Sequence, residues 1–335
     1  MLPDDRSLRY RIFLTIVLVV LLPFVFIYAF VAAINWILLP VLESLGYGPF
    51  HGRFYVSPGL AVLVVAGGLI AQLWFGPPRV LSSIGARPVS PEQHPDLVDT
   101  ITRLSQQADL KPPSVAISHN KAPNAAAVKG PRNRTIVVTT GLLETLDQAE
   151  LEAVLAHEIA HLKNRDATIM TVAWLLPTLT YYMAIVTATG IYYLYRGLGT
   201  SGGRGGRGTA HALVILTVTA IVTVAISALF WAASVLVHRV LSRYREYAAD
   251  RGAIGLTGDP VSLASALRKL DRTMPEVPDH DLRRLDGGAE ALYVAPLEGR
   301  AFTDAELVST DLFPETHPPT RKRIERLEDL AGELA

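Results

Sequence analysis

The sequence contains no cysteine, which excludes disulfide bonds, thiol catalysis and thiolate metal ligands. A metal ion in this protein would have to be held by histidine, aspartate or glutamate. The chain has no net charge, because 31 acidic residues balance 31 basic ones, so no overall positive field points to nucleic acid as a partner. Half of the 335 residues are hydrophobic, which is high for a soluble protein and indicates membrane spans.

Charged side chains are absent from four apolar runs, each long enough to cross a bilayer, which takes about 20 residues. These runs cover residues 12–39, 56–75, 167–195 and 212–237. The first run is about twice as long as the apolar part of a signal peptide and holds no small-residue cleavage site. We therefore expect a retained anchor and about four transmembrane helices.

Between the second and third runs, the sequence pattern changes to that of a small soluble α+β region. Apolar spacing, turn residues and β-favouring stretches predict helices at 97–110, 143–146 and 147–164, and strands at 114–118, 125–128 and 135–140. Residues 125–128 are expected to pair with the later strand as a hairpin, and Asp147 is expected to cap the helix that follows it.

The rest of the chain consists of a linker and a second soluble part. Residues 197–208 are glycine-rich and predict a flexible linker, and helices are expected at 241–254, 260–273 and 320–330. The predicted order is an anchor with two spans, a soluble part, two further spans or membrane-associated helices, and a soluble C-terminal part, over 1–75, 76–166, 167–238 and 239–335. The fold class is mainly α, an integral membrane protein with a small β-sheet.

The main chemical signal is a pair of histidines one helical turn apart, His157 and His161, with Glu158 directly after the first. Residues i and i+4 share one helix face, so both imidazoles can reach one ion at about 2.0–2.1 Å. Glu158 lies about 100° around the helix and can accept a proton from water without being a ligand. This spacing is typical of zinc metalloproteases, with Glu158 as the general base.

A third protein ligand is required, and Glu246 is the candidate. Two apolar runs separate it from His161, so two crossings would return the chain to the side it left. His161 precedes the third run by six residues, and Glu246 follows the fourth by nine. Both are therefore expected near the same membrane surface. Asp250 is one helical turn after Glu246 and is expected to orient a ligand imidazole.

With these residues in place, the sequence resembles the gluzincin-type membrane proteases, the group that includes HtpX and the CAAX prenyl proteases, with HtpX the closer match. The resemblance rests on residues 157–161 and 246–250 and covers nearly the whole chain. Residues 123–127 are similar to the family's Asn-Ala-Phe-Ala segment, with Ala126 in place of the aromatic residue. Residues 317–324 are similar to the family's C-terminal His-Pro segment and the arginine after it.

The resemblance implies a zincin-like fold, one zinc ion per chain and endopeptidase action on membrane proteins, often damaged or misfolded ones. It implies that Asn124 lies on the strand that pairs with extended substrate, that His317 acts near the oxyanion or supports the site, and that Arg323 forms a salt bridge. A turn asparagine and a loop histidine are the simpler alternatives for the first two. Asp166 is expected to be a helix-terminal carboxylate rather than the partner of a histidine.

The distribution of arginines predicts that both termini and the catalytic part face the cytoplasm, as in a multi-pass protein of the cell membrane. Arginines precede the first run and follow the second and fourth. The glycine-rich segment disagrees, because it carries Arg204 and Arg207, with Arg196 directly before it, and no acid. The alternative is that the third and fourth runs form a hairpin that does not fully cross.

Three other functions remain open at this stage. A dedicated processing protease of the CAAX type would suit a larger set of spans, and an inactive scaffold would not need Glu158. A metal carrier or channel is disfavoured by spans without charge. The expected partners are membrane-protein or peptide substrates and the lipid bilayer; the ligand types also fit other divalent metals, and the oligomeric state is open.

Overall fold

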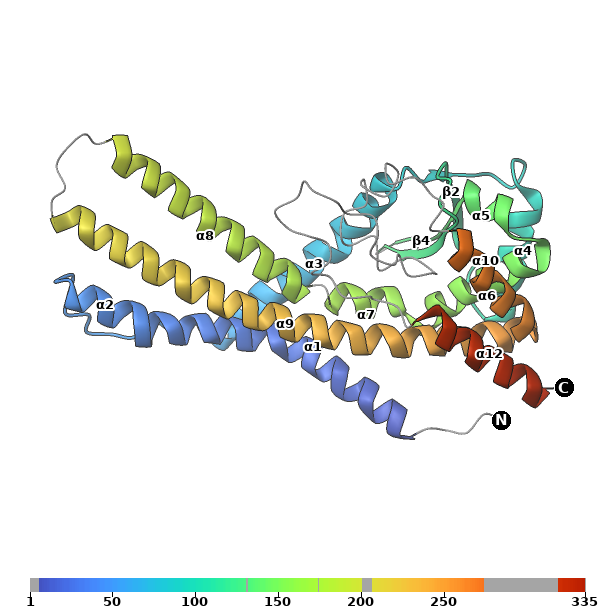
Figure 1. Ribbon diagram of the computed structural model, residues 1–335, viewed down its shortest axis with the longest axis horizontal. Coiled ribbons are helices and arrows are strands. Elements are labelled where there is room, and N and C mark those ends of the chain that lie inside the picture. The colour runs from blue at the N-terminus through green and yellow to red at the C-terminus, as the bar shows by residue number, and fades with distance from the viewer. Residues whose placement is uncertain (1–5, 131, 174, 201–206, 274–318, 335) are drawn as a thin grey trace. The chain divides into compact units, whose positions relative to one another are not determined.

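The computed structural model of the chain describes residues 6–130, 132–173, 175–200, 207–273 and 319–334 (Figure 1). It divides into two compact units, and each is described by itself. The first, called the helical unit, comprises Met1–Ile70 and Val172–Val237. The second, called the catalytic unit because it holds residues 157–161, comprises Ala71–Thr171 and His238–Ala335.

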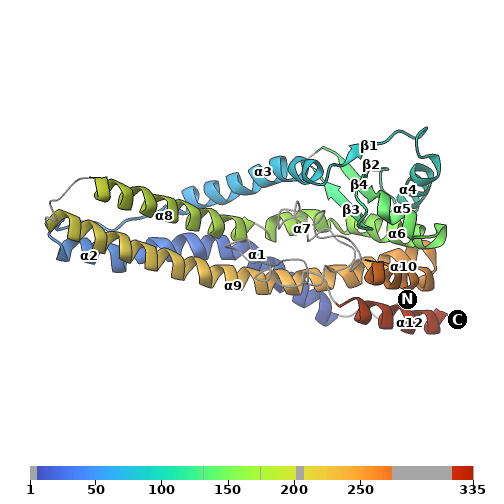
Figure 2. The same ribbon diagram turned by 45° about the horizontal axis from the view of Figure 1, so that its top comes forward.

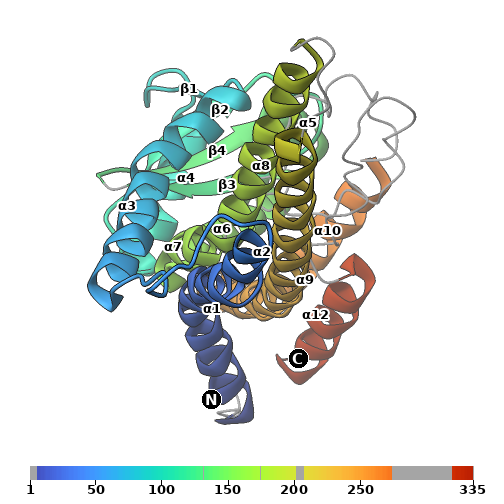
Figure 3. The ribbon, with the colours of Figure 1, turned by 90° about the vertical axis from the view of Figure 1, so that its left-hand side faces the viewer.

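Long apolar helices make up the helical unit. Its elements are α1 (Arg6–Ala33), a π-helical turn (Ile34–Leu38), α2 (Leu39–Ser44), the start of α3 (Pro58–Ser83), the end of α7 (Asp166–Ala173), α8 (Leu175–Thr200) and the first part of α9 (Arg207–Thr257). Phe26, Leu176 and Phe230 form a buried cluster that joins α1, α8 and α9. Figure 3 shows the ribbons of these three helices. Many other large apolar side chains are exposed, as on a lipid-facing surface, for example Leu63 and Leu229 at 68% each.

Among the described residues, four helices are long and apolar enough to cross a membrane, as predicted: Val17–Ser44, Pro58–Pro78, Thr168–Tyr193 and Ala210–Ser234. Two boundaries differ from the sequence-based expectation. Helix α8 continues to Thr200, into the predicted glycine linker. Helix α9 joins the fourth run and the predicted 241–254 helix without a break, because no proline or glycine lies between residues 209 and 251.

The catalytic unit contains a four-stranded sheet in the order β1–β2–β4–β3 (Figure 2). Its strands are β1 (Arg87–Pro88), β2 (Ser114–Ser118), β3 (Ala125–Lys129) and β4 (Arg134–Thr139). Strands β3 and β4 form the expected antiparallel hairpin, with Ala127 opposite Ile136, while β2 runs parallel to β4. Among the described strands, β3 therefore lies at one edge of the sheet.

The two faces of the sheet meet different partners, because side chains alternate along each strand. Ile117, Ala127 and Ile136 are among the residues that face the main core. That core also takes side chains from α4 (Pro95–Gln107), α6 (Gln148–Asn164), α10 (Pro260–Thr273) and α12 (Thr320–Leu334). On the other face, Ala116, Val128 and Val137 pack against side chains at and after the end of α3. Helix α5 (Thr140–Thr145) follows β4 directly.

A candidate metal centre between helices α6 and α9

Helix α6 carries the histidine pair, and its sequence fixes its start. The Asp147 side chain accepts a hydrogen bond from the backbone N–H of Glu150, and the Glu150 side chain accepts one from the backbone N–H of Asp147, a complete capping box. Glu150 also accepts hydrogen bonds from Ser265 and Lys269 on α10. The helix is thus held at its first turn, while all side chains from Ala153 to Leu162 are buried.

The two histidines direct the same ring nitrogen toward one point. Nε2 of His157 and Nε2 of His161 lie 3.0 Å apart. One side-chain nitrogen or oxygen from each of His157, Glu158 and His161 lies within 4.8 Å of the others. The Glu246 carboxylate completes the group, with one oxygen 3.4 Å from Nε2 of His157 and the other 3.6 Å from Nε2 of His161. The structure thus brings together the three residues predicted to hold the metal.

These distances fit a zinc ion. Tetrahedral coordination with bonds of 2.0–2.1 Å places neighbouring ligand atoms about 3.3 Å apart. The donor set of two imidazoles and one carboxylate is the one found in several catalytic zinc sites. His157, Glu246 and Glu158 are all at most 3% exposed.

A close contact between two small residues lets α9 approach α6. A Cβ atom on Gly252 would lie 2.6 Å from Cβ of Ala160, which is closer than real Cβ atoms come. Ala249 and Ala253 flank the glycine and are also buried. Glycine at 252 therefore allows the helix with Glu246 to pack directly against the helix with both histidines.

A carboxylate and an arginine stand behind His157. Nδ1 of His157 lies 3.0 Å from an oxygen of Asp250, the residue predicted to orient an imidazole. Arg323 on α12 donates to both oxygens of Asp250, over 2.9 and 2.6 Å, and its Nη1 lies 3.2 Å from Glu246. The Arg323 side chain is fully buried. The salt bridge expected for Arg323 therefore lies inside the site.

A second carboxylate and a second arginine stand behind His161. Nδ1 of His161 lies 2.6 Å from an oxygen of Asp166, which corrects the expectation that Asp166 is only a helix-terminal carboxylate. The reason is local: Arg165 ends α6 with a left-handed backbone, φ 60°, and this turns Asp166 back toward the helix it follows. Arg245 lies 3.4 Å from Glu246 and 4.0 Å from Asp166. Sequence reasoning missed Arg245; its only signal was its position next to Glu246.

The charges of these buried groups favour a divalent cation. Four carboxylates, from Glu158, Asp166, Glu246 and Asp250, share the site with two guanidinium groups, so the described acids exceed the arginines by two charges. Burial lowers the pKa of His157, but the carboxylates of Asp250 and Glu246 more than offset this and raise it from 6.5 to about 9. The site therefore attracts positive charge, whether a proton or a metal ion.

Two predicted site residues remain, Asn124 and His317, and the structure describes only the first. Asn124 directly precedes the edge strand β3; its backbone N–H donates to the Thr139 hydroxyl over 2.8 Å and its carbonyl accepts from the Thr139 N–H over 2.9 Å. These bonds extend the β3–β4 pairing beyond Ala125. His317 lies outside the described residues.

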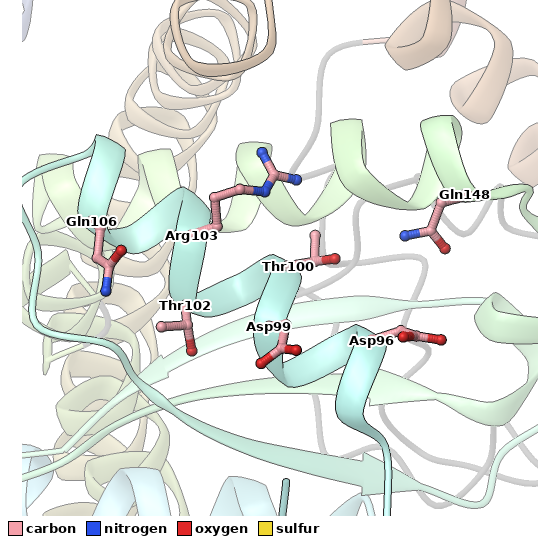
Figure 4. Close-up of a pocket in the computed structure, with 7 residues that line it drawn as sticks. All are labelled: Asp96, Asp99, Thr100, Thr102, Arg103, Gln106 and Gln148. Carbon is pink, nitrogen blue, oxygen red and sulfur yellow. The ribbon is translucent and has the colours of Figure 1, made fainter.

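A shallow hollow on helix α4 lies outside the metal centre. Figure 4 shows its lining, which comes from one face of α4 and from Gln148 at the start of α6. Arg103 in this lining forms a salt bridge of 2.8 Å with Glu152. None of the residues that line it belongs to the metal centre.

Known proteins match this chain over most of its length. Residues 91–331 match the family model described as Peptidase family M48. "Protease HtpX homolog 2" of Methanosarcina mazei is 40% identical over 85% of this chain and 90% of the relative. "Protease HtpX homolog" of Moorella thermoacetica is 35% identical over 99% of this chain and 97% of the relative.

A solved structure, the crystal structure of S. mikatae Ste24p, is similar at 16% identity with a TM-score of 0.49. It covers 92% of this chain, which spans 65% of that protein, just under two thirds. The family match includes α6 and the Glu246 segment of α9 and extends to α12. The chain therefore belongs to peptidase family M48, as a multi-pass membrane metallopeptidase of the HtpX type.

Proposed function

We propose that this protein is a zinc-dependent endopeptidase that cleaves membrane proteins, misfolded or damaged ones in particular, at the cytoplasmic surface of the cell membrane. The observation that carries the proposal is the convergence of His157, His161 and Glu246, whose ligand atoms lie 3.0–3.6 Å apart. Four helices that are long and apolar enough to span a membrane support the choice of substrates in or next to the bilayer. A role in protein quality control and stress response follows from this choice of substrate.

Glu158 is the proposed general base. It is buried, it directly follows the first histidine, and its carboxylate belongs to the same cluster of ligand atoms. In this position it can take a proton from the attacking water and pass it to the leaving amine. Zinc, when bound, supplies a Lewis acid that polarises the scissile carbonyl and makes water more acidic.

The carboxylates of Asp250 and Asp166 hold the imidazoles in place. Each lies within 3.0 Å of Nδ1 of one histidine, which leaves Nε2 of both rings directed to the ion. A carboxylate in this position also makes the imidazole a better ligand. Arg323 compensates the charge of Asp250 and keeps that carboxylate ionised, which is why burial does not raise the pKa of Asp250 above its usual range.

Strand β3 is the proposed docking edge for an extended substrate. It is an edge strand of the sheet, and α6 packs against it. A peptide added to such an edge is held by backbone hydrogen bonds, which suits a protease with many substrates. The Asn124–Thr139 bonds fix the chain where β3 begins.

The deciding experiment measures both zinc content and cleavage of a model membrane protein. Glu158→Gln should keep about one zinc per chain and lose at least 100-fold in kcat, because general-base catalysis contributes about 10²–10⁴-fold. Glu152→Gln on the same helix, where Arg103 pairs with the native carboxylate, is the matched control and should keep full activity. Unchanged turnover by Glu158→Gln would refute the assigned role. Retention of zinc by Glu246→Ala would remove Glu246 from the ligands.

A further inference from the structure

The turn between β3 and β4 lies against residues that end two of the candidate membrane spans. Nζ of Lys129 donates a hydrogen bond of 3.2 Å to the hydroxyl of Thr168, the first residue of the span Thr168–Tyr193. The guanidinium of Arg132 lies 5.4 Å from the ring centre of Trp74, in the last turns of the span Pro58–Pro78. The turn is therefore expected to lie at the level of the lipid headgroups.

Four basic side chains lie close together at this turn, and no described carboxylate pairs with them. Lys129 is paired in register with Arg134. Burial lowers the pKa of Lys129, and the nearby charges of Arg134 and Arg165 lower it further. Among the residues that the structure describes, Lys129, Arg132, Arg134 and Arg165 form no ion pair with a carboxylate.

The sequence around the turn also lacks acids. Residues 110–143 contain five basic residues and no aspartate or glutamate, and residues 44–91 contain no acid either. Asp166 follows Arg165, but its carboxylate is buried against His161. These four cations, called the basic cluster below, therefore have no carboxylate partner in the part of the chain that the structure describes, and an anion from outside the chain can pair with them.

We propose that the basic cluster binds the phosphate of an anionic phospholipid. The aromatic neighbours favour a lipid over an acidic peptide: Trp74 and Phe75 are 48% and 60% exposed at the end of their span, where aromatic side chains anchor helices to the membrane interface. Basic residues next to a span attract anionic headgroups within about a Debye length. Two of the four cations have defined contacts, since Lys129 donates to Thr168 and Arg132 lies over the Trp74 ring.

Native mass spectrometry of the full chain in detergent micelles tests this proposal without any use of peptidase activity. Phosphatidylglycerol and phosphatidylcholine are titrated separately at two salt concentrations. The native chain is expected to retain phosphatidylglycerol at least fivefold more tightly, with a preference that falls as salt rises. Arg132→Gln/Arg134→Gln should reduce this preference by about fivefold for each charge removed, since each basic residue near an anionic surface contributes about that factor.

Two further variants distinguish binding at the basic cluster from an effect of the total charge of the protein. Arg321→Gln/Lys322→Gln removes the same two charges from exposed positions on α12 and should keep the preference. Arg132→Lys/Arg134→Lys retains the charge and should keep most of it. Equal affinity of the native chain for both lipids would overturn the proposal, as would the same loss in both Gln double variants. Unchanged lipid affinity of Arg132→Gln/Arg134→Gln would overturn it as well.

Discussion

The two histidines of the metal centre are supported in parallel ways but by parts of the chain at different distances. His161 is held by Asp166, five residues later, with Arg245 4.0 Å beyond it. His157 is held by Asp250, which is far downstream on α9. Arg323 on α12 donates two hydrogen bonds to that carboxylate. One pair depends on a single turn of backbone, and the other depends on three helices packing correctly.

This difference shows which of the two pairs depends on the tertiary structure. The His161–Asp166 pair can form as soon as α6 and the turn at Arg165 form. The His157–Asp250 pair requires α9 to lie against α6 and α12 to deliver a fully buried arginine. Metal binding therefore depends on a local element and on distant ones, and the first substitutions below each weaken one of the two pairs.

The largest effect is expected from Arg323→Met. It would leave the carboxylates of Asp250 and Glu246 buried without their guanidinium partner, and breaking a buried ion pair costs about 3–5 kcal/mol. Arg245→Met should cost less, because the Arg245 guanidinium makes longer contacts, 3.4 Å to Glu246 and 4.0 Å to Asp166, and is slightly more exposed than Arg323. The free energy of unfolding of the zinc-depleted protein, from denaturant titration in micelles, measures both. Equal costs would mean that the two pairs are equivalent.

Next in size are the effects on zinc affinity. Asp250→Asn should weaken zinc binding toward the upper end of the 10–100-fold range that such supporting carboxylates contribute, because it also disrupts the contact with Arg323. Asp166→Asn should weaken it toward the lower end, since only one imidazole is affected. Competition with a chromogenic chelator gives both dissociation constants. A larger loss of zinc affinity in Asp166→Asn than in Asp250→Asn would show that the His161–Asp166 pair contributes more to zinc binding.

A substitution at the contact between α6 and α9 tests the His157–Asp250 pair without changing any charged group. Gly252→Ala would push α9 away from Ala160 and is expected to cost about 1 kcal/mol or more by overpacking. Gly255→Ala on the same helix meets nothing within 4 Å and should be neutral or stabilising, since alanine favours helix. Thermal unfolding in micelles compares them. If Gly252→Ala also weakens zinc binding while Gly255→Ala does not, the packing of α9 positions Asp250 and Glu246.

The same contrast explains what could be predicted from the sequence. Helix α6 and its cap were predictable because the apolar spacing and the Asp147–Glu150 box are local. The strand pair was predictable for the same reason, since β3 and β4 are neighbours joined by a turn. Counting membrane crossings predicts that Glu246 lies near the same membrane surface as His161, an argument about topology that does not need the fold.

The misses have physical causes. The structure brings Asp166 to His161 through a left-handed residue that is not glycine, Arg165, and the sequence carries no sign of that conformation. Arg245 belongs to the site only because its face of α9 turns toward Asp166, which requires knowledge of how α9 packs. The continuity of α9 was predictable, because no helix-breaking residue separates its two parts.

The smallest effect is expected at Asp147, which caps the helix that carries both histidines and so bears on both pairs. The hydrogen bond from the backbone N–H of Glu150 lowers the pKa of Asp147 below 3.8, so its contribution to stability is present above that pH and is lost as the pH falls through the lowered value. Asparagine caps a helix about as well but does not titrate. The native chain should therefore be slightly more stable than Asp147→Asn at pH 7, and the two unfolding midpoints should converge below pH 3.8. A gap that stays constant across this range would show that the charge of Asp147 does not stabilise α6, and that the cap acts through hydrogen bonds alone.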